Sequence, residues 1–482
     1  MAAGVGVGAF AAGPFFSRSF AADTASAALP PGTGREGHRY VIRGGAVLSM
    51  DSAVGDFARA DVLVDGKKIL AIGPNIDAGT APVIDAVGRI VMPGFIDTHH
   101  HQFETALRSY IPNGLLANDG RLHGAVNYME YVLGKLAPVY QPEDVYISEL
   151  FGSLSQLDAG VTTVHDLSQI HHTPAHTDAA IKGIADSGRR TAFSYSESQA
   201  NNTRFPDEVR RIRRQYFSAN DQLLTMVIGS EIYEPGYADT WKLARDLDLP
   251  IASHVVGSSM SGSFAAIAKT RQLGPKNLLI HMTLIDDSSW KIAADSGAGV
   301  SLSVPIEMTM RHGTPPILKV LSLGLEPSLS SDVECTMAAD FFTQMRSAMT
   351  LQRMLVNEAA LKGDASQPAL LTARDVIRFA TLCGAEDLWL GDKVGSLTIG
   401  KEADIILLDA TALNVAPLNN VPGAVVTLMD RSNVETVIVA GKIRKWKGQL
   451  QDANIAMLRS QIIASRDRIF AAARIGQNLF GN

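Results

Sequence analysis

The chain is poor in cysteine and has no excess of positive charge, and each shortage excludes a class of protein. Cys335 and Cys383 are its only cysteines, too few for a disulfide framework and at a spacing unlike that of a zinc ribbon. The formal net charge is -6 and the isoelectric point is near 6.1. The chain therefore lacks the excess of positive charge that attracts nucleic acid. We therefore expect a small-molecule substrate, no nucleic-acid partner, and assembly as a homo-oligomer.

Long apolar runs are also scarce, and the one at the N-terminus is too short to span a membrane with certainty. Residues 1–16 are small and apolar, and small residues follow up to position 37. This segment resembles a secretory signal, although no basic residue precedes the apolar part. Residues 1–37 are interpreted as a signal-like or disordered leader. The enzyme would be periplasmic or secreted in the first case and cytoplasmic in the second, with no membrane partner in either.

Short β-segments occupy both ends of the chain that follows this leader. Residues 38–93 contain apolar or alternating runs punctuated by Gly and Asp, as in Lys68 to Gly73. Similar segments return in residues 387–450, at Gly395 to Leu397, Ala403 to Asp409 and Val434 to Lys442. One small β-sandwich built from both chain ends explains this better than two modules. Residues 451–482 are predicted to end in a helix.

Between these ends, strand patterns alternate with helical patterns eight times, which predicts a (β/α)₈ TIM barrel over residues 94–386. Amphipathic helical stretches separate the strands, and a further helix is predicted from Thr372 to Ala385. The predicted strands are the one that leads into His99, followed by Val161 to Asp166, Arg190 to Ser194, Leu223 to Gly229, Ile251 to His254, Leu278 to His281, Gly299 to Ser303 and Pro327 to Asp332.

The first barrel strand ends in an acid and three histidines, Asp97-Thr98-His99-His100-His101. Side chains alternate between the two faces of a strand, so His99 and His101 point the same way and His100 points opposite. Two imidazoles side by side at a strand end make half of a metal site. Their place behind an apolar strand in mid-chain is unlike that of a tag or a solvated histidine run.

Polar side chains also end other barrel strands, at the rim where barrels of this kind carry their chemistry. They comprise His99, His101, His165, Asp166, His254, His281 and Asp332. Of these, His99, His101, His254 and Asp332 offer nitrogen and oxygen ligands for one divalent ion, zinc in preference to iron or manganese. His281 is left as an acid or base beside the ion.

This donor set predicts hydrolysis by an activated water. A bound divalent ion lowers the pKa of its water to around 7. Asp332 would accept the proton of that water, and His281 would polarise the carbonyl under attack. His281 and Asp332 are therefore the predicted catalytic residues.

At this point the chain resembles the amidohydrolase superfamily, in the branch of triazine hydrolases and cytosine deaminase-like enzymes. The resemblance runs from about Val41 to Lys442 and implies the same metal ligands and the same catalytic histidine. The motifs that carry it are Pro93-Gly94-Phe95-Ile96-Asp97 with its His-x-His, Ala159-Gly160-Val161-Thr162-Thr163, Ser253-His254, Ile280-His281-Met282, Ser331-Asp332 and Gly400-Lys401-Glu402-Ala403-Asp404.

The chain departs from this family's deaminases at one position. They usually carry a glutamate three residues after the strand-five histidine, where it moves a proton to the ring nitrogen of the substrate. Here that position is Gly257, which cannot transfer a proton. Glu307 or Glu334 could supply the acid, or could instead be structural partners of Arg311 or another cation.

Other polar residues are predicted to contact the substrate or to have alternative roles. The predicted substrate contacts are Glu307, His312, Glu334 and Gln102. The histidines at 171, 172 and 176 could form a second metal locus, or could simply precede and begin a helix. The loop from Ser109 to Pro138 carries tyrosines and leucines. It could cover the barrel mouth and favour an aromatic or hydrophobic substrate, or pack in a subunit interface.

The sequence therefore predicts a metal-dependent hydrolase of a non-peptide C–N bond in an amide, a carbamate or a urea-like molecule. Hydrolytic deamination or dechlorination of an N-heteroaromatic ring is the alternative. An inactive barrel that serves as a scaffold is a remote third interpretation, because such barrels lose their ligands and here every expected position is filled.

Overall fold

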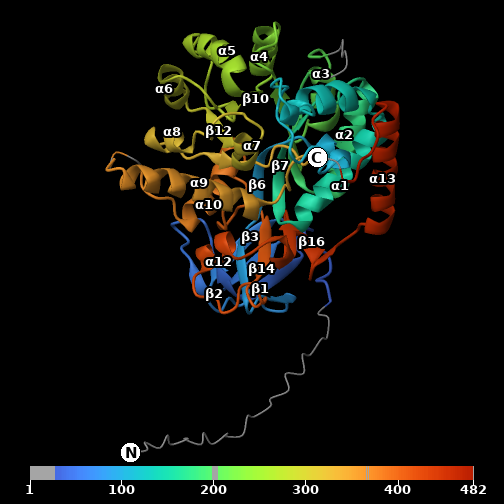
Figure 1. Cartoon of the computed structure of the whole chain (residues 1–482). Helices are drawn as coiled ribbons and strands as arrows, with labels where there is room; N and C mark the ends of the chain where they lie inside the picture. The colour runs from blue at the N-terminus through green and yellow to red at the C-terminus, as the bar shows by residue number, and fades with distance from the viewer. Residues whose placement is uncertain (1–27, 198–204, 365, 367, 481–482) are drawn as a thin grey trace, which may run out of the picture.

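The computed structural model describes residues 28–197, 205–364, 366 and 368–480 as two β-sheets with their covering helices. Residues 1–27 of the predicted leader (residues 1–37) lie outside the described part of the chain. Figure 1 shows the barrel with its helices above and the second sheet below, made of strands from both ends of the chain. No helix among the described residues is long and apolar enough to cross a membrane.

The barrel sheet contains eight parallel strands in sequential order, which confirms the predicted fold. Apolar side chains fill both of its faces, as expected for a parallel sheet covered by helices. Its strands are β6 (Phe95–His100), β7 (Val161–Ser168), β8 (Arg190–Tyr195), β9 (Leu224–Gly229), β10 (Ile251–His254), β11 (Asn277–Ile280), β12 (Gly299–Leu302) and β13 (Ser328–Leu329).

Helices connect these strands and cover the outside of the barrel (Figure 1). The described chain also has five short segments of other helix types, η1 (Gln102–Leu107), η2 (Leu122–Gly124), η3 (Tyr128–Leu136), η4 (Ala137–Val139) and η5 (Arg431–Asn433). The helices of the barrel region are α1 (Pro142–Asp158), α2 (Pro174–Ser187), α3 (Val209–Tyr216), α4 (Tyr237–Asp246), α5 (Gly257–Lys269), α6 (Asp287–Ser296), α7 (Val304–Thr309), α8 (Ile317–Ser322), α9 (Phe341–Leu361), α10 (Ala373–Phe379) and α11 (Leu382–Asp387).

The helix predicted from Thr372 to Ala385 is in fact two helices, α10 and α11. The break at Ala380 leaves its carbonyl oxygen free to accept a hydrogen bond from the Ile96 amide of β6, at 2.9 Å. Helical periodicity continues across the break, so the pattern gave no sign of it. The C-terminal helix is present as α13 (Ile455–Ala472), which lies beside α1 (Figure 1).

The second sheet joins both ends of the chain around a separate apolar core. Strand β14 pairs antiparallel with β5, so residues more than 300 positions apart lie side by side. Helix α12 (Val421–Thr427) lies in the same C-terminal part. The strands are β1 (Arg39–Val47), β2 (Phe57–Asp65), β3 (Lys68–Gly73), β4 (Val83–Asp85), β5 (Arg89–Pro93), β14 (Ile405–Asp409), β15 (Val434–Val439), β16 (Lys442–Trp446) and β17 (Gln449–Leu450).

The predicted β-segment at Gly395 to Leu397 is wrong, because the chain bends at Gly395 and Ser396 and forms no strand there. Leu397 is fully buried in the core of the second sheet, and its amide donates a hydrogen bond to the Ser49 carbonyl oxygen at 2.7 Å. A single buried leucine held by one backbone bond imitates the apolar pattern of a short strand.

Gly94 connects the two sheets directly, since β5 ends at Pro93 and β6 begins at Phe95. A Cβ atom at Gly94 would lie 2.2 Å from the Thr162 side chain, so only glycine fits there. The Gly94 amide also donates to the Asp404 carbonyl oxygen at 3.1 Å. The second sheet thereby fixes the start of the strand that carries the histidines.

The barrel closes between its first and last strands mainly through polar side chains. Only an isolated backbone bridge, His100 to Asp332, joins the β6 and β13 sides among the described residues. The Thr98 hydroxyl lies 2.9 Å from the Ser328 hydroxyl and donates to the Leu329 carbonyl oxygen at 3.0 Å. The eighth strand, β13, comprises only Ser328–Leu329 and is shorter than the predicted Pro327 to Asp332.

A buried ion pair joins the barrel to the second sheet. The Arg190 guanidinium, at the start of β8, donates to both carboxylate oxygens of Asp404, at 2.9 and 3.0 Å. It also donates to Glu402 at 2.7 Å. All three side chains are almost fully buried, so removing the cation would leave two carboxylates without their compensating charge.

We expect Arg190→Met to lower the stability of the folded chain by about 3 kcal/mol, because the unpaired carboxylates stay in the interior. Urea denaturation followed by circular dichroism measures the shift in midpoint. Arg39→Met is the matched control, since Arg39 pairs with Asp65 on the surface of the same sheet and such pairs contribute about 1 kcal/mol at most. Equal shifts in the two variants would contradict the role given to the buried pair.

Candidate metal centre

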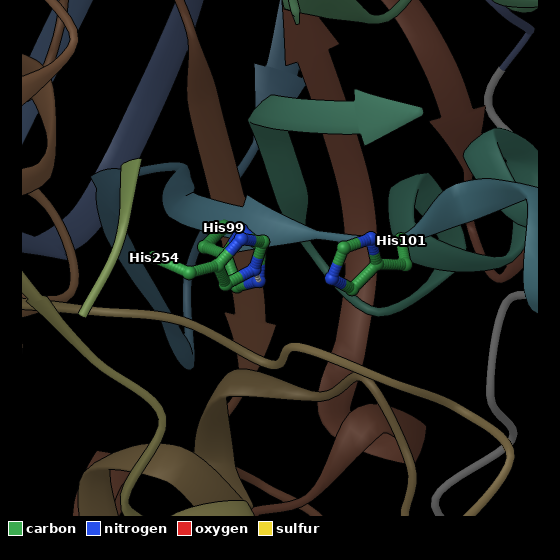
Figure 2. A group of neighbouring side chains, drawn as sticks. All are labelled: His99, His101 and His254. Carbon is green, nitrogen blue, oxygen red and sulfur yellow. Dashed lines mark hydrogen bonds between the residues drawn. The ribbon is translucent and has the colours of Figure 1, made fainter. Parts of the chain in front are cut away.

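His99 and His101 project from the end of β6 toward the same space, as strand alternation predicts. Figure 2 shows the rings of His99, His101 and His254 gathered around that space. The ring centroids of His99 and His101 are 4.6 Å apart. His100 faces the other way, and its Nδ1 atom lies 3.0 Å from the Ser331 hydroxyl. Of the three consecutive histidines, His99 and His101 therefore face the candidate site, and His100 contacts the surrounding structure.

His254 and Asp332 complete the cluster from the ends of the fifth and eighth strands. His254 Nε2 lies 3.2 Å from His99 Nε2. Asp332 Oδ1 lies 3.1 Å from His99 Nε2 and 3.7 Å from His101 Nε2. Atoms of the three histidines lie within 4.8 Å of one another, and so do atoms of His99, His281 and Asp332.

This donor set fits a divalent metal ion. Two imidazole nitrogens, His99 Nε2 and His254 Nε2, face each other at hydrogen-bond distance beside a carboxylate oxygen. Imidazole and carboxylate donors that converge on one point suit zinc and similar ions. The residues that would hold the ion are His99, His101, His254 and Asp332.

Neighbouring groups orient two of these imidazoles. His101 Nδ1 donates to the Leu167 carbonyl oxygen of β7 at 2.9 Å. His254 Nδ1 lies 2.6 Å from Glu231 Oε1, at the end of the fourth strand. Each contact leaves Nε2 as the atom that faces the centre, which is how metal-binding histidines are usually held. Glu231 is therefore a partner of His254.

Burial sets the charge of the cluster. It lowers the pKa of His99 well below its usual value and that of His101 to about 3, so both rings are neutral at pH 7. Burial alone would lower the pKa of His254 too, but the adjacent Glu231 carboxylate outweighs it and raises that pKa. Burial opposes ionisation of Asp332, yet His281 and His99 hold its pKa well below the usual range. Neutral imidazole and ionised carboxylate are the forms that bind metal.

His281 stands next to the ligands at the end of β11. Its Nε2 atom lies 3.5 Å from Asp332 Oδ2, and its Nδ1 atom lies 3.0 Å from Glu307 Oε1. The His281 backbone has φ of 73°, in the left-handed region that non-glycine residues seldom adopt. Strain of this kind concentrates at functional positions, because the surroundings must impose it.

Asp97 connects the His-x-His strand to the loop that bears Asp332. Its Oδ1 atom accepts hydrogen bonds from the backbone amides of Ser331 at 3.0 Å and His99 at 3.3 Å. Its Oδ2 atom accepts from the Ser331 hydroxyl and from Gln156 Nε2. The sequence placed Asp97 in the motif but did not reveal this role, because its partner Ser331 is 234 residues away.

The predicted substrate contacts are dispersed around the centre. Glu307 lies behind His281, fully buried, and also accepts a hydrogen bond from the Ser303 amide at 2.9 Å. Glu334 pairs with Arg108 at 2.7 Å. Gln102 turns into the barrel wall, where its Oε1 atom accepts from Arg189 at 3.0 Å. A contact between the substrate and Glu307, Glu334 or Gln102 stays a prediction, and each residue already has a partner in the protein.

Among the four predicted substrate contacts, only the His312 side chain has no hydrogen-bond partner in the described part of the chain. It lies in the loop after α7, almost fully buried, with its ring centroid 4.8 Å from that of His281 and an interplanar angle of 81°. Arg311, beside it, pairs with Asp119 at 2.5 Å and not with Glu307 or Glu334. The predicted pairing of Glu334 with another cation is confirmed by its contact with Arg108.

The second histidine group does not form a metal cluster in the described part of the chain. His171 Nδ1 lies 3.1 Å from the Thr177 hydroxyl, and His172 Nε2 donates to the Ala137 carbonyl oxygen at 2.9 Å. His176, in the first turn of α2, lies 3.1 Å from the Tyr140 carbonyl oxygen. These side chains fasten α2 to the segment before α1.

The loop from Ser109 to Pro138 crosses over the polar rim of the same chain. Its Leu116 amide donates to the Met310 carbonyl oxygen at 2.9 Å, and Asp119 pairs with Arg311. Tyr128 is buried and donates to Glu104 Oε1 at 2.6 Å. These contacts hold the loop next to His101, whose ring centroid is 6.4 Å from that of Tyr128. A role as a cover over the barrel mouth or as part of a subunit interface stays a prediction.

Glu104 is a buried acid near the centre that the sequence did not single out. Burial raises its pKa to about 8, whereas hydrogen bonds with Tyr128 and Cys335 lower it. Its position three residues after His101 was the available signal. Only the fold shows that Cys335, 231 residues further on, lies beside it.

Comparison with known proteins agrees with this geometry. The model of the amidohydrolase family matches residues 90–444. The 5'-deoxyadenosine deaminase of Methanosarcina mazei is 26% identical over 441 residues, which are 87% of this chain and 95% of that protein. The 5-methylthioadenosine/S-adenosylhomocysteine deaminase of Symbiobacterium thermophilum is 27% identical over 431 residues, 84% of this chain and 93% of the relative.

Two solved structures share the fold at lower identity. An adenosine deaminase from Xanthomonas campestris with bound zinc has a TM-score of 0.77 at 22% identity, covering 91% of this chain and 100% of the other. An atrazine chlorohydrolase from Arthrobacter aurescens complexed with zinc has a TM-score of 0.77 at 21% identity, covering 89% and 100%. The matched family region spans well over half of the sequence and contains all four candidate ligands. The chain belongs to the amidohydrolase family and is a hydrolase that acts on C–N bonds.

Proposed function

We propose that the protein hydrolyses a non-peptide C–N bond of an amide, a carbamate or a urea-like molecule, using water activated by one divalent ion. The observation that carries this proposal is the backbone at Gly257, three residues after the ligand His254. Its φ is 61°, which glycine adopts freely and a residue with a side chain adopts only under strain. The position therefore favours glycine and not the proton-shuttling glutamate of ring deaminases.

The residues at the centre divide the work of amide hydrolysis. A divalent ion, when bound, supplies a water acidic enough to become a nucleophile at neutral pH. Asp332 Oδ2 accepts the proton of that water and passes it to the leaving nitrogen as the C–N bond breaks, so that the amine departs neutral. His281 Nε2, 3.5 Å from the same carboxylate oxygen, stabilises the negative charge that develops on the carbonyl oxygen under attack.

Glu307 determines which nitrogen of His281 carries the proton. Burial raises the pKa of Glu307 well above its usual value, which favours the protonated carboxyl. In that form Oε1, 3.0 Å from His281 Nδ1, can donate to this nitrogen while it accepts from the Ser303 amide. The proton of the neutral imidazole then resides on Nε2, where it can be donated to the developing oxyanion.

Hydrolytic deamination of an N-heteroaromatic ring is the second candidate, because the curated relatives described above are named as deaminases. That reaction needs an acid near the ring nitrogen. Glu307 is engaged with His281 and Glu334 with Arg108, so neither is free to replace the acid missing at Gly257. An inactive scaffold is the least supported reading, because all four ligand positions are filled and converge.

Metal analysis of the purified chain, coupled to a substrate screen, tests the proposal. The screen contains aryl amides, carbamates, ureas and aminated heterocycles, and it records whether an organic amine or ammonia is released. We expect about one metal ion per chain and release of an amine. Ammonia released from a ring would establish the second candidate instead. Absence of both metal and activity after addition of zinc, iron or manganese would favour the scaffold.

Replacing a ligand should remove both metal and turnover. We expect His99→Ala and Asp332→Ala to lose bound zinc and catalytic rate together, because each removes a donor atom from the centre. Zinc content by elemental analysis and turnover on the best substrate of the screen are the two readouts. His172→Ala, which alters a histidine away from the centre, should retain both. Near-normal turnover in either ligand variant would defeat the single-ion site.

A glutamine should replace Glu307 with little loss. The amide of Glu307→Gln can donate to His281 Nδ1 as the protonated carboxyl does, whereas Glu307→Leu cannot donate. We expect kcat to fall by less than about threefold in the glutamine variant and by about 10- to 100-fold in the leucine variant. Steady-state kinetics at pH 7 measure the difference. Equal losses in the two variants would show that the ionised carboxylate is required.

A further inference from the structure

The ring of His312 is buried, yet neither of its nitrogens has a hydrogen-bond partner in the described part of the chain. Folded proteins satisfy most buried polar atoms, and an unpaired one requires an explanation. Two unpaired nitrogens on one imidazole are costly, because each loses its bond to water without gaining another. Such a cost is expected where a ligand supplies the missing partner.

The backbone holds this ring in place. The Thr283 hydroxyl donates to the His312 carbonyl oxygen at 2.7 Å, and the same hydroxyl accepts from the Gly257 amide at 2.9 Å. On either side, Arg311 pairs with Asp119, and a Cβ atom at Gly313 would lie 3.0 Å from Leu284. The unpaired state of the ring therefore does not arise from a loose loop, because the hydrogen bond from Thr283 and the ion pair of Arg311 both hold this segment.

His312 is also next to the reaction centre. Its ring contacts that of His281 edge to face. The charges of Asp332 and His254 also influence the pKa of His312. Its carbonyl oxygen would lie 3.5 Å from a Cβ atom at Gly257. The residue thus occupies the side of the centre that borders position 257, where the family's deaminases carry the acid that serves a substrate nitrogen.

We propose that His312 accepts a hydrogen bond from the N–H of the leaving nitrogen and thereby selects substrates with an N–H at the scissile bond. This proposal rests on the proposed function. A neutral imidazole has one acceptor nitrogen and one N–H donor. Burial lowers the pKa of His312 to about 3, with His281 adding to the effect, so the ring is neutral at pH 7. His281 already serves the carbonyl oxygen, which leaves the nitrogen of the C–N bond for His312.

The substrates accepted should then depend on the leaving atom. Secondary amides, carbamates and ureas with an N–H satisfy the acceptor nitrogen. An ester of the same acyl group, or an N-methylated amide, would leave the acceptor nitrogen unpaired in the complex. Sites built to hydrogen-bond a substrate group discriminate strongly against analogues that lack it.

The test compares three probes, 4-nitroacetanilide, its N-methyl derivative and 4-nitrophenyl acetate, in wild type and in His312→Phe. Phenylalanine retains an aromatic ring against His281 but has no acceptor. We expect kcat/KM for the anilide to fall by about 10- to 100-fold in the variant and that for the ester to change by less than about threefold. His312→Gln, whose carbonyl oxygen can accept a bond, should recover part of the loss. Equal effects on anilide and ester would overturn the proposal.

Thermal unfolding of the zinc-loaded protein without substrate gives a second readout that needs no turnover. Phenylalanine removes two unpaired buried nitrogens, so we expect the midpoint of His312→Phe to equal or exceed that of wild type. A lower midpoint at unchanged zinc content would assign the ring a structural role and overturn the proposal. If the wild type releases ammonia from aminated rings, the proposed function fails separately. The variants are then assayed on the ring, and an unchanged rate in His312→Phe rejects the contact.

Discussion

The hydrogen bonds of Asp97 are the interaction on which the candidate centre most depends. One carboxylate holds the backbone of His99 on the first strand and the amide and hydroxyl of Ser331 before Asp332. The strands on either side of this closure share only an isolated bridge in the described chain. The Asp332 amide also donates to the His99 carbonyl oxygen at 3.0 Å, and the His101 amide donates to the Asp332 carbonyl oxygen at 2.9 Å. The Asp97 side chain and these two backbone bonds together hold Asp332 beside His99, where other neighbouring barrel strands share a longer backbone ladder.

The cost of assembling this centre is distributed over the surrounding structure. His281 and Asp332 both have positive φ, and five ionisable side chains lie buried within a few ångströms of one another. Conformations and charges of this kind persist only where rigid neighbours impose them. The neighbours here are the barrel strands, the carboxyls of Glu231 and Glu307, and the second sheet, which is fastened to β8 through Arg190.

The residues that end the barrel strands were predictable, and their partners were not. His99, His101, His254 and Asp332 each follow a recognisable strand pattern, and the carboxyl ends of parallel strands meet at one rim. The bond of His254 to Glu231 and that of Asp97 to Ser331 depend on tertiary packing, which leaves no periodic trace. Leu397 shows the opposite error, because burial of a single apolar residue imitated a strand. The unpaired state of His312 could be recognised only after every neighbouring polar atom had been placed.

The closure between β6 and β13 also determines when during synthesis the centre can form. His99 and Asp332 are separated by 233 positions along the chain, and six further barrel strands must be laid down between their own strands. Domains fold as units during synthesis, from the N-terminal end first. A nascent chain that has exposed three histidines still lacks the fourth donor, so the ion is expected to enter a nearly complete barrel. Metal would then bind late, only to chains whose barrel is already nearly complete.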